Sequence, residues 1–215
     1  MDAAAHVFAS KGLEHATMDD VARHASVSKG ALYLYFASKD ELYLTLAVEA
    51  VSELLQRVEN LPQSRTGLER VSRMLECYVQ FSLAEPQRFH LSTAWMAPGY
   101  RFGSGGELTK QYRAGVVALL RSAVEAVEAG KRDGTIRADL DARSTTLEVW
   151  SGIIGVLLVR MKQMEAPTDP PPLLDPTVWD DACADIDGHR GFDFDRLIPT
   201  FTESVLQAIR PQNGC

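Results

Sequence analysis

The sequence contains few cysteines, no long hydrophobic run and no surplus of positive charge. Its three cysteines, Cys77, Cys183 and Cys215, are scattered and odd in number, so neither a disulfide framework nor a zinc-ligand spacing follows. The longest apolar run, residues 152–159, is far shorter than the ~18 residues that a membrane-spanning helix needs. The N-terminus shows no basic stretch followed by an apolar core, which would mark a secretory signal. These absences predict reduced thiols, no membrane association and a cytoplasmic location.

Catalytic and metal-binding motifs are also missing. There is no G-x-S-x-G, no H-E-x-x-H and no Walker loop, so we expect neither an enzyme nor a bound cofactor. The run Asp185-x-Asp187-Gly188 is similar to part of a calcium loop, but Phe194 stands where the final Glu ligand is expected. A solvated acidic loop is the simpler interpretation, and no metal site is predicted.

What the sequence does contain is a regular helical pattern. With 215 residues, of which 46% are hydrophobic and 24% charged, the chain can form one large or two small globular domains. Apolar residues recur at helical spacing, and no alternation typical of strands persists. The Pro- and Asp-rich stretch 165–191 is expected to be irregular, with room for a short helix at 177–184. We predict an all-α protein of about nine helices, at 2–11, 19–25, 28–36, 38–60, 66–84, 86–95, 107–130, 142–164 and from 193 or 195 to 209.

Residues 17–39 indicate two short helices joined by a tight turn. Thr17 is placed to cap the first helix, and the second opens on Ser28, Lys29 and Gly30. Small residues and hydroxyls at a helix start suit close approach to a phosphate chain. The spacing of six apolar residues would let both helices bury one face: Val21, Ala22, Ala25, Val27, Leu32 and Phe36.

This stretch resembles the helix-turn-helix of TetR-family transcriptional regulators over about residues 1–50. The motif stands here as Thr17, Val21-Ala22, Ala25-Ser26-Val27-Ser28, Gly30 to Phe36, Ser38-Lys39 and Leu42. Ser26 departs from the usual glycine, which eases a turn residue toward positive φ. The resemblance implies an N-terminal three-helix DNA-binding domain, residues 1–45. A helical ligand-binding and dimerisation domain, residues 46–215, would follow.

Carried over position by position, the resemblance implies DNA contacts from the reading helix and its flanks. Lys29 is the best candidate for a base edge, because lysine can donate to guanine. Thr17 and Ser28 would donate hydroxyl hydrogens to phosphates. Tyr33 and Tyr35 could instead be packing residues, although both cannot face inward. The full set of expected DNA contacts is Thr17, Ser28, Lys29, Gly30, Tyr33, Leu34, Tyr35 and Lys39.

The charge does not follow the pattern of a strong DNA binder. The whole chain carries a net charge of −7, and residues 1–50 hold four Lys or Arg against seven Asp or Glu. This balance argues against strong non-specific binding, which depends on cations. Carboxylates in the first turns of helices favour the helix dipole and soften the argument. A basic segment before residue 1 is the hypothesis that would supply the missing charge.

The second half is rich in aromatic side chains, for which ordinary core packing is the alternative interpretation. The resemblance implies a ligand cavity there, filled by a small, largely apolar effector. A lone helix-turn-helix reads little sequence, so a homodimer on pseudo-palindromic double-stranded DNA is expected. The glycines Gly152 and Gly155 would allow close helix approach at the interface. We expect the ligand at Tyr78, Phe89, Trp95, Tyr112 and Trp150, and the dimer interface at Trp150, Ile154, Leu158, Phe201, Val205 and Ile209.

Three functions are compatible with the sequence. The first is a DNA-binding repressor that an apolar effector releases from its operator. The second keeps the DNA-binding head without a ligand, as a constitutive DNA- or partner-binding regulator. The third, an enzyme with a vestigial head, is the weakest, because no nucleophile–base pair can be assembled from the sequence.

Overall fold

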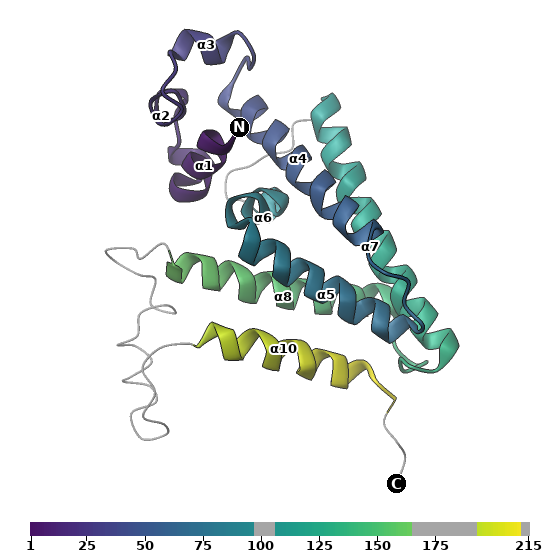
Figure 1. Cartoon of the computed structure of the whole chain (residues 1–215). Coiled ribbons are helices and arrows are strands. Elements are labelled where there is room, and N and C mark those ends of the chain that lie inside the picture. The colour runs from purple at the N-terminus through teal and green to yellow at the C-terminus, as the bar shows by residue number, and fades with distance from the viewer. Residues whose placement is uncertain (97–105, 165–192, 212–215) are drawn as a thin grey trace. The chain divides into compact units, whose positions relative to one another are not determined.

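The computed structural model describes residues 1–96, 106–164 and 193–211 (Figure 1). Within these ranges the chain forms nine α-helices, one 3-10 helix and no strand, so the all-α prediction is confirmed. The short helix expected at 177–184 and the acidic loop around Asp185 lie outside the described residues. The helices are α1 Asp2–His15, α2 Met18–His24, α3 Lys29–Tyr33, α4 Lys39–Glu59, α5 Gly67–Ala84, α6 Pro86–Ser92, η1 Ala94–Met96, α7 Glu107–Asp133, α8 Ala142–Met164 and α10 Phe194–Ile209.

The chain separates into two compact units. One comprises Met1–Gln63 with Glu76–Glu125, and the other comprises Ser64–Leu75 with Ala126–Cys215. Helices α5 and α7 therefore contribute residues to both units. The functional division expected at residues 45 and 46 stays a prediction.

The first unit is built around α4. Figure 1 shows α1, α2 and α3 grouped beside the N-terminal half of this helix. The ring of Phe8 on α1 is fully buried and meets the ring of Tyr43 edge to face, with centroids 5.1 Å apart. On α7, Gly115 faces Val51 so closely that an added Cβ would collide with it. Burial of these apolar groups is the main favourable term that holds the unit together.

Two helix termini are more irregular than the sequence predicts. Gly12 takes φ +71° and ψ 163°, a non-helical conformation that interrupts α1 where the stop was predicted, and a last helical turn then runs to His15, which lets Leu13 reach the core. At the start of α4, Ser38 accepts a hydrogen bond from the Glu41 amide, as a cap should. The Glu41 carboxylate, however, accepts from the amide of Ala37, 2.7 Å away, one residue before the cap.

The second unit contains α8 and α10, which lie side by side (Figure 1). The ring of Phe201 fills the space over Gly152, where an added Cβ would lie 2.5 Å from a ring carbon. The amide of Arg137 donates to the carbonyl of Ile209 at 3.0 Å and ties the end of α10 to the connector before α8. The packing of Phe201 explains why position 152 is a glycine.

Helix α8 also has the length and apolar composition of a membrane span over Ala142–Met161, with mean hydropathy 1.2. The core helix of a soluble protein passes the same test, and α8 packs against α10 within its unit. The stretch 147–161 is rich in apolar residues, yet Leu147, Glu148 and Ser151 are exposed, so the described residues leave one side of α8 uncovered.

Candidate functional site

The start of α2 is fixed by reciprocal hydrogen bonds between Thr17 and Asp20. The Thr17 hydroxyl accepts from the Asp20 amide at 3.1 Å and donates to the Asp20 carboxylate at 2.8 Å, while the Thr17 amide donates to that carboxylate at 3.1 Å. A hydrogen bond from Lys11, 2.7 Å away, together with those from Thr17 lowers the pKa of Asp20 to about 2. The Thr17 hydroxyl hydrogen, expected to reach a phosphate, is thus engaged within the helix cap.

The turn between α2 and α3 is tight. Ser26 adopts φ +56°, which is the single positive φ among the described residues other than glycine. The next amide, that of Val27, donates to the carbonyl of Ala22 at 3.0 Å and closes the turn. The expectation that this position requires the conformation usually supplied by glycine is confirmed, and Ser26 adopts it at some steric cost.

Helix α3 is shorter than predicted. Ser28 is its cap, accepting a hydrogen bond from the Ala31 amide at 3.1 Å, and the helix ends at Tyr33 rather than Phe36. The amides of Tyr35 and Phe36 both donate to the carbonyl of Leu32, so the chain continues as a turn toward α4. At Gly30 an added Cβ would meet only the Ser28 hydroxyl, at 3.9 Å, and the backbone there is open to an approaching molecule.

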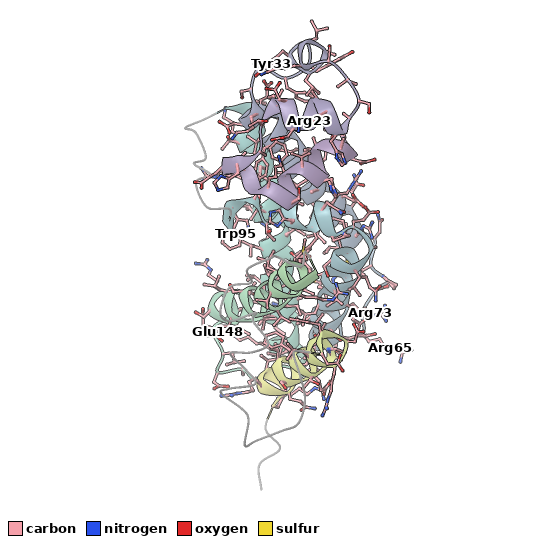
Figure 2. The ribbon with its side chains drawn as sticks, turned by 90° about the vertical axis from the view of Figure 1, so that its left-hand side faces the viewer. Arg23, Tyr33, Arg65, Arg73, Trp95 and Glu148 are labelled. Atoms are coloured by element: carbon pink, nitrogen blue, oxygen red, sulfur yellow. The ribbon has the colours of Figure 1, made fainter. Side chains whose placement is uncertain are left out.

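The side chains of α3 and the following turn project away from the unit. Tyr33, Leu34 and Tyr35 are 47%, 83% and 79% exposed, which excludes the packing interpretation of the two tyrosines. Figure 2 shows Tyr33 on α3 and Arg23 on α2 within this group of helices. Val27, expected to be buried, is exposed as well, and the other residues of the expected buried set that are not fully covered are Ala25, Leu32 and Phe36, which are half-buried. We call Val27, Tyr33, Leu34 and Tyr35 the exposed apolar face.

The cations expected to contact DNA have partners within the chain. The Lys29 ammonium donates to the Asp19 carboxylate at 2.8 Å, and this bond raises the pKa of Lys29. The Lys39 ammonium donates to the carbonyls of Leu13 and Glu14, at 2.7 and 3.2 Å, and so completes the C-terminal end of α1. Arg23, which was not among the predicted DNA contacts, is highly exposed and approaches Asp20 only at 3.5 Å. Its basic side chain in the last turn of α2 could have identified it as a candidate.

The region expected to hold a ligand is built around Tyr112 on α7. Its hydroxyl donates to the carbonyl of Ser92 at 2.8 Å and accepts from the amide of Trp95 at 3.2 Å. Beside it lies an open pocket of about 270 Å³, lined by Trp95, Tyr112, Arg113, Val116 and Val117. The last three residues were not predicted, although Val116 follows Tyr112 at helical spacing.

The other predicted ligand residues are placed differently. Tyr78 and Phe89 are buried and do not line this pocket. The Phe89 ring meets Phe81 edge to face, with centroids 6.3 Å apart. Trp150 is buried in the second unit. Among the described residues there is no cluster of three or more His, Cys, Asp or Glu side chains that could hold a metal.

The predicted dimer residues differ in how far the chain already covers them. Trp150, Ile154 and Ile209 are buried, whereas Leu158, Phe201 and Val205 are half-buried. The two glycines of α8 also differ. Gly152 lies against Phe201, but an added Cβ at Gly155 would meet no atom of the described residues within 4 Å. The uncovered side of α8 therefore includes Gly155.

Known proteins match this chain in sequence and in fold. Residues 1–46 match the family described as bacterial regulatory proteins, tetR family. The transcriptional activator FasR of Mycolicibacterium smegmatis is 34% identical over 90 residues, 41% of this chain and 41% of that protein. The transcriptional repressor KstR2 of Rhodococcus jostii is 28% identical over 148 residues, 66% of this chain and 68% of that protein.

Similarity of fold extends further along the chain. The crystal structure of the regulator FadR from Bacillus subtilis in complex with stearoyl-CoA is 20% identical, with a TM-score of 0.63 over 97% of both chains. The chain spans less than half the length of FasR and of several other curated relatives that it matches. The helix-turn-helix geometry and the match over residues 1–46 show that the chain begins with a DNA-binding domain of the tetR-family type, and its overall fold is similar to that of FadR.

Proposed function

We propose that the protein is a cytoplasmic homodimeric repressor that a small, largely apolar effector releases from a pseudo-palindromic operator. The exposed apolar face carries this proposal. Large apolar side chains are normally buried, so their projection from a helix-turn-helix indicates a surface that meets another molecule. In the geometry of this motif, that molecule is the major groove of DNA.

The proposed contacts follow from which groups stay available. The hydroxyls of Tyr33 and Tyr35 and the side chain of Leu34 project into solvent, where phosphates, base edges and thymine methyl groups would meet them. The backbone around Gly30 is open to close approach. Lys29 contributes after leaving Asp19, and Lys39 acts mainly by fixing α1. Thr17 and Ser28 act chiefly as helix caps, with their oxygens oriented toward backbone amides.

For the effector, the pocket beside Trp95 is the proposed site. Its walls are mainly apolar, and the exposed guanidinium of Arg113 lies at its edge, which suits an apolar molecule with an anionic end. FadR of Bacillus subtilis, a protein of the same fold, was crystallised with stearoyl-CoA, a molecule of this kind. The Tyr112 hydroxyl is already occupied by two hydrogen bonds to the backbone. Its role would be to orient Trp95, whose amide donates to this hydroxyl.

Dimerisation is proposed through the uncovered side of α8 together with α10. Leu158, Phe201 and Val205 are half-buried in the single chain and would complete their burial in the dimer. Gly155 would allow a partner helix to approach closely. Leu147, exposed on the same helix, extends this surface beyond the predicted residues.

The two glycines of α8 offer a matched test of the dimer. Gly155→Leu has room in the single chain, so the folded protomer should persist while a partner helix is excluded. Gly152→Leu collides with Phe201 and should instead destabilise the protomer. Sedimentation velocity and thermal unfolding separate the two results. A dimer that survives Gly155→Leu unchanged would place the interface elsewhere.

The effector is tested by release of DNA. A duplex enriched by the wild-type protein from a randomised pool is titrated with stearoyl-CoA, and binding is followed by fluorescence anisotropy. Val117→Asp, on the pocket wall, should weaken release at least about tenfold, because it buries a charge beside an apolar ligand. Leu83→Asp, which alters an exposed leucine that does not line the pocket, is the control. A protein that binds DNA but responds to no apolar ligand would favour a ligand-independent regulator.

A further inference from the structure

The lysines of the DNA-binding head are all engaged within the chain. Lys11 pairs with Asp20 at 2.7 Å, Lys29 with Asp19 at 2.8 Å, and Lys39 with the carbonyls at the end of α1. Two of these interactions have a structural task, because Asp20 forms the cap of α2 and Lys39 completes α1. The pair of Lys29 and Asp19 is different.

Asp19 and Lys29 join the first turns of α2 and α3, and neither side chain forms a helix cap. The cap of α2 is made by Thr17 and Asp20, and the cap of α3 by Ser28. Both partners are about half exposed, at 56% for the Asp19 side chain and 49% for the Lys29 side chain. An exposed ion pair of this kind contributes little to stability. Its placement at the start of the reading helix therefore needs another explanation.

DNA and Asp19 compete for the same ammonium group. Lys29 must leave the carboxylate to donate to a phosphate or to guanine, and Asp19 then faces a polyanion from the first turn of α2. Arg23 offers little compensation, since it is a single exposed cation that also faces Asp20. Any duplex carries phosphates, but only a suitable sequence offers a base edge to Lys29. The cost of breaking the pair thus falls on every duplex, whereas the compensating base contact comes only from the operator.

We propose that Asp19 is an intramolecular competitor that holds Lys29 and lowers the affinity of the head for DNA of any sequence, so that only a duplex with compensating base contacts is bound tightly. The inference rests on the proposed placement of α3 on DNA. Removing the Asp19 charge should tighten binding to non-operator DNA by about threefold to tenfold at low salt, because it frees one cation and removes one repulsive charge. Binding to the operator should tighten by a similar factor, because the same pair is broken there. The slope of log K against log salt should become steeper by about 0.9 for one additional phosphate contact.

The test uses four full-length variants with the wild-type protein. They are D19N, K29Q, the double variant D19N/K29Q, and D40N, which removes an exposed carboxylate from the first turn of α4. Binding is measured by fluorescence anisotropy at salt concentrations from about 50 to about 300 mM, a range wide enough to determine the slope of log K against log salt. The probes are a mixed-sequence 30-bp duplex and the duplex enriched by the wild-type protein. Thermal unfolding confirms that each variant is folded.

The expected result is a gain for D19N on both duplexes that is smaller in the K29Q background and larger than the gain for D40N. A gain that is equally large in the K29Q background, or that D40N matches, would show a general charge effect and overturn the inference. So would wild-type affinity for D19N on the mixed-sequence duplex. If the folded wild-type protein binds no duplex at all, the proposed function itself fails, an outcome distinct from the others.

Discussion

Aromatic side chains serve opposite purposes in two regions of the same compact unit. Tyr33 and Tyr35, in α3 and the turn after it, are largely exposed, whereas Phe89 on α6 and Tyr112 on α7 are almost completely buried. The buried pair has partners within the chain, a ring contact for Phe89 and two backbone hydrogen bonds for Tyr112. The exposed pair projects from a short helix that covers little. The same residue types thus stabilise the fold in one region and remain available for a partner in the other.

The lysines of the head differ in the same way. Lys39 is part of the architecture because it binds carbonyls 25 and 26 residues earlier in the chain. Lys29 is instead paired with a carboxylate on the surface, and both partners are about half exposed. Residue type alone does not distinguish a cation that holds the fold together from one that is engaged only in a surface ion pair.

The largest expected effect separates the buried from the exposed aromatics. Phe89→Ala should lower the free energy of unfolding by about 3–5 kcal/mol, because it leaves a cavity in the core. Tyr35→Ala should change it by less than about 0.5 kcal/mol while weakening operator binding. Urea denaturation and anisotropy measure the two quantities. Comparable losses of stability in both variants would remove the distinction between the two regions.

A medium effect separates the two lysines. Lys39→Ala should cost about 1.5–3 kcal/mol of stability, since it removes a charged donor from two carbonyls at the end of α1. Lys29→Ala should cost less than about 1 kcal/mol. Both should weaken operator binding and leave the dimer intact. Loss of DNA binding by Lys39→Ala at unchanged stability would show that this lysine contacts phosphate directly.

The smallest effect concerns the cap of α2 and depends on pH. The pKa of Asp20 is lowered from its ordinary value of 3.8 to about 2 in the folded state, so its ionised form stabilises the fold. That contribution is complete above about pH 4 and disappears as the pH falls from about 4 toward 2. Asp20→Asn should therefore be less stable than the wild-type protein at pH 7, with the difference shrinking over this window. A difference that does not vary with pH would assign the effect to packing.

Local features of this protein followed from its sequence. The all-α class, the helix-turn-helix, the Thr17 cap and the positive φ at Ser26 were all predicted, because each depends on residues within a few positions of one another. Helical periodicity and capping operate over one or two turns, so a linear sequence displays them directly.

Longer connections were not predictable from the sequence. Asp19 with Lys29, Leu13 with Lys39, and Ser92 with Tyr112 are separated by 10, 26 and 20 residues. Each depends on which helix ends meet in space, and the side chains involved can reach many alternative partners. The sequence alone therefore determined which helices form and which of them resembles a reading helix. The tertiary structure decided which cations, hydroxyls and aromatic rings are occupied, because that depends on packing between distant segments.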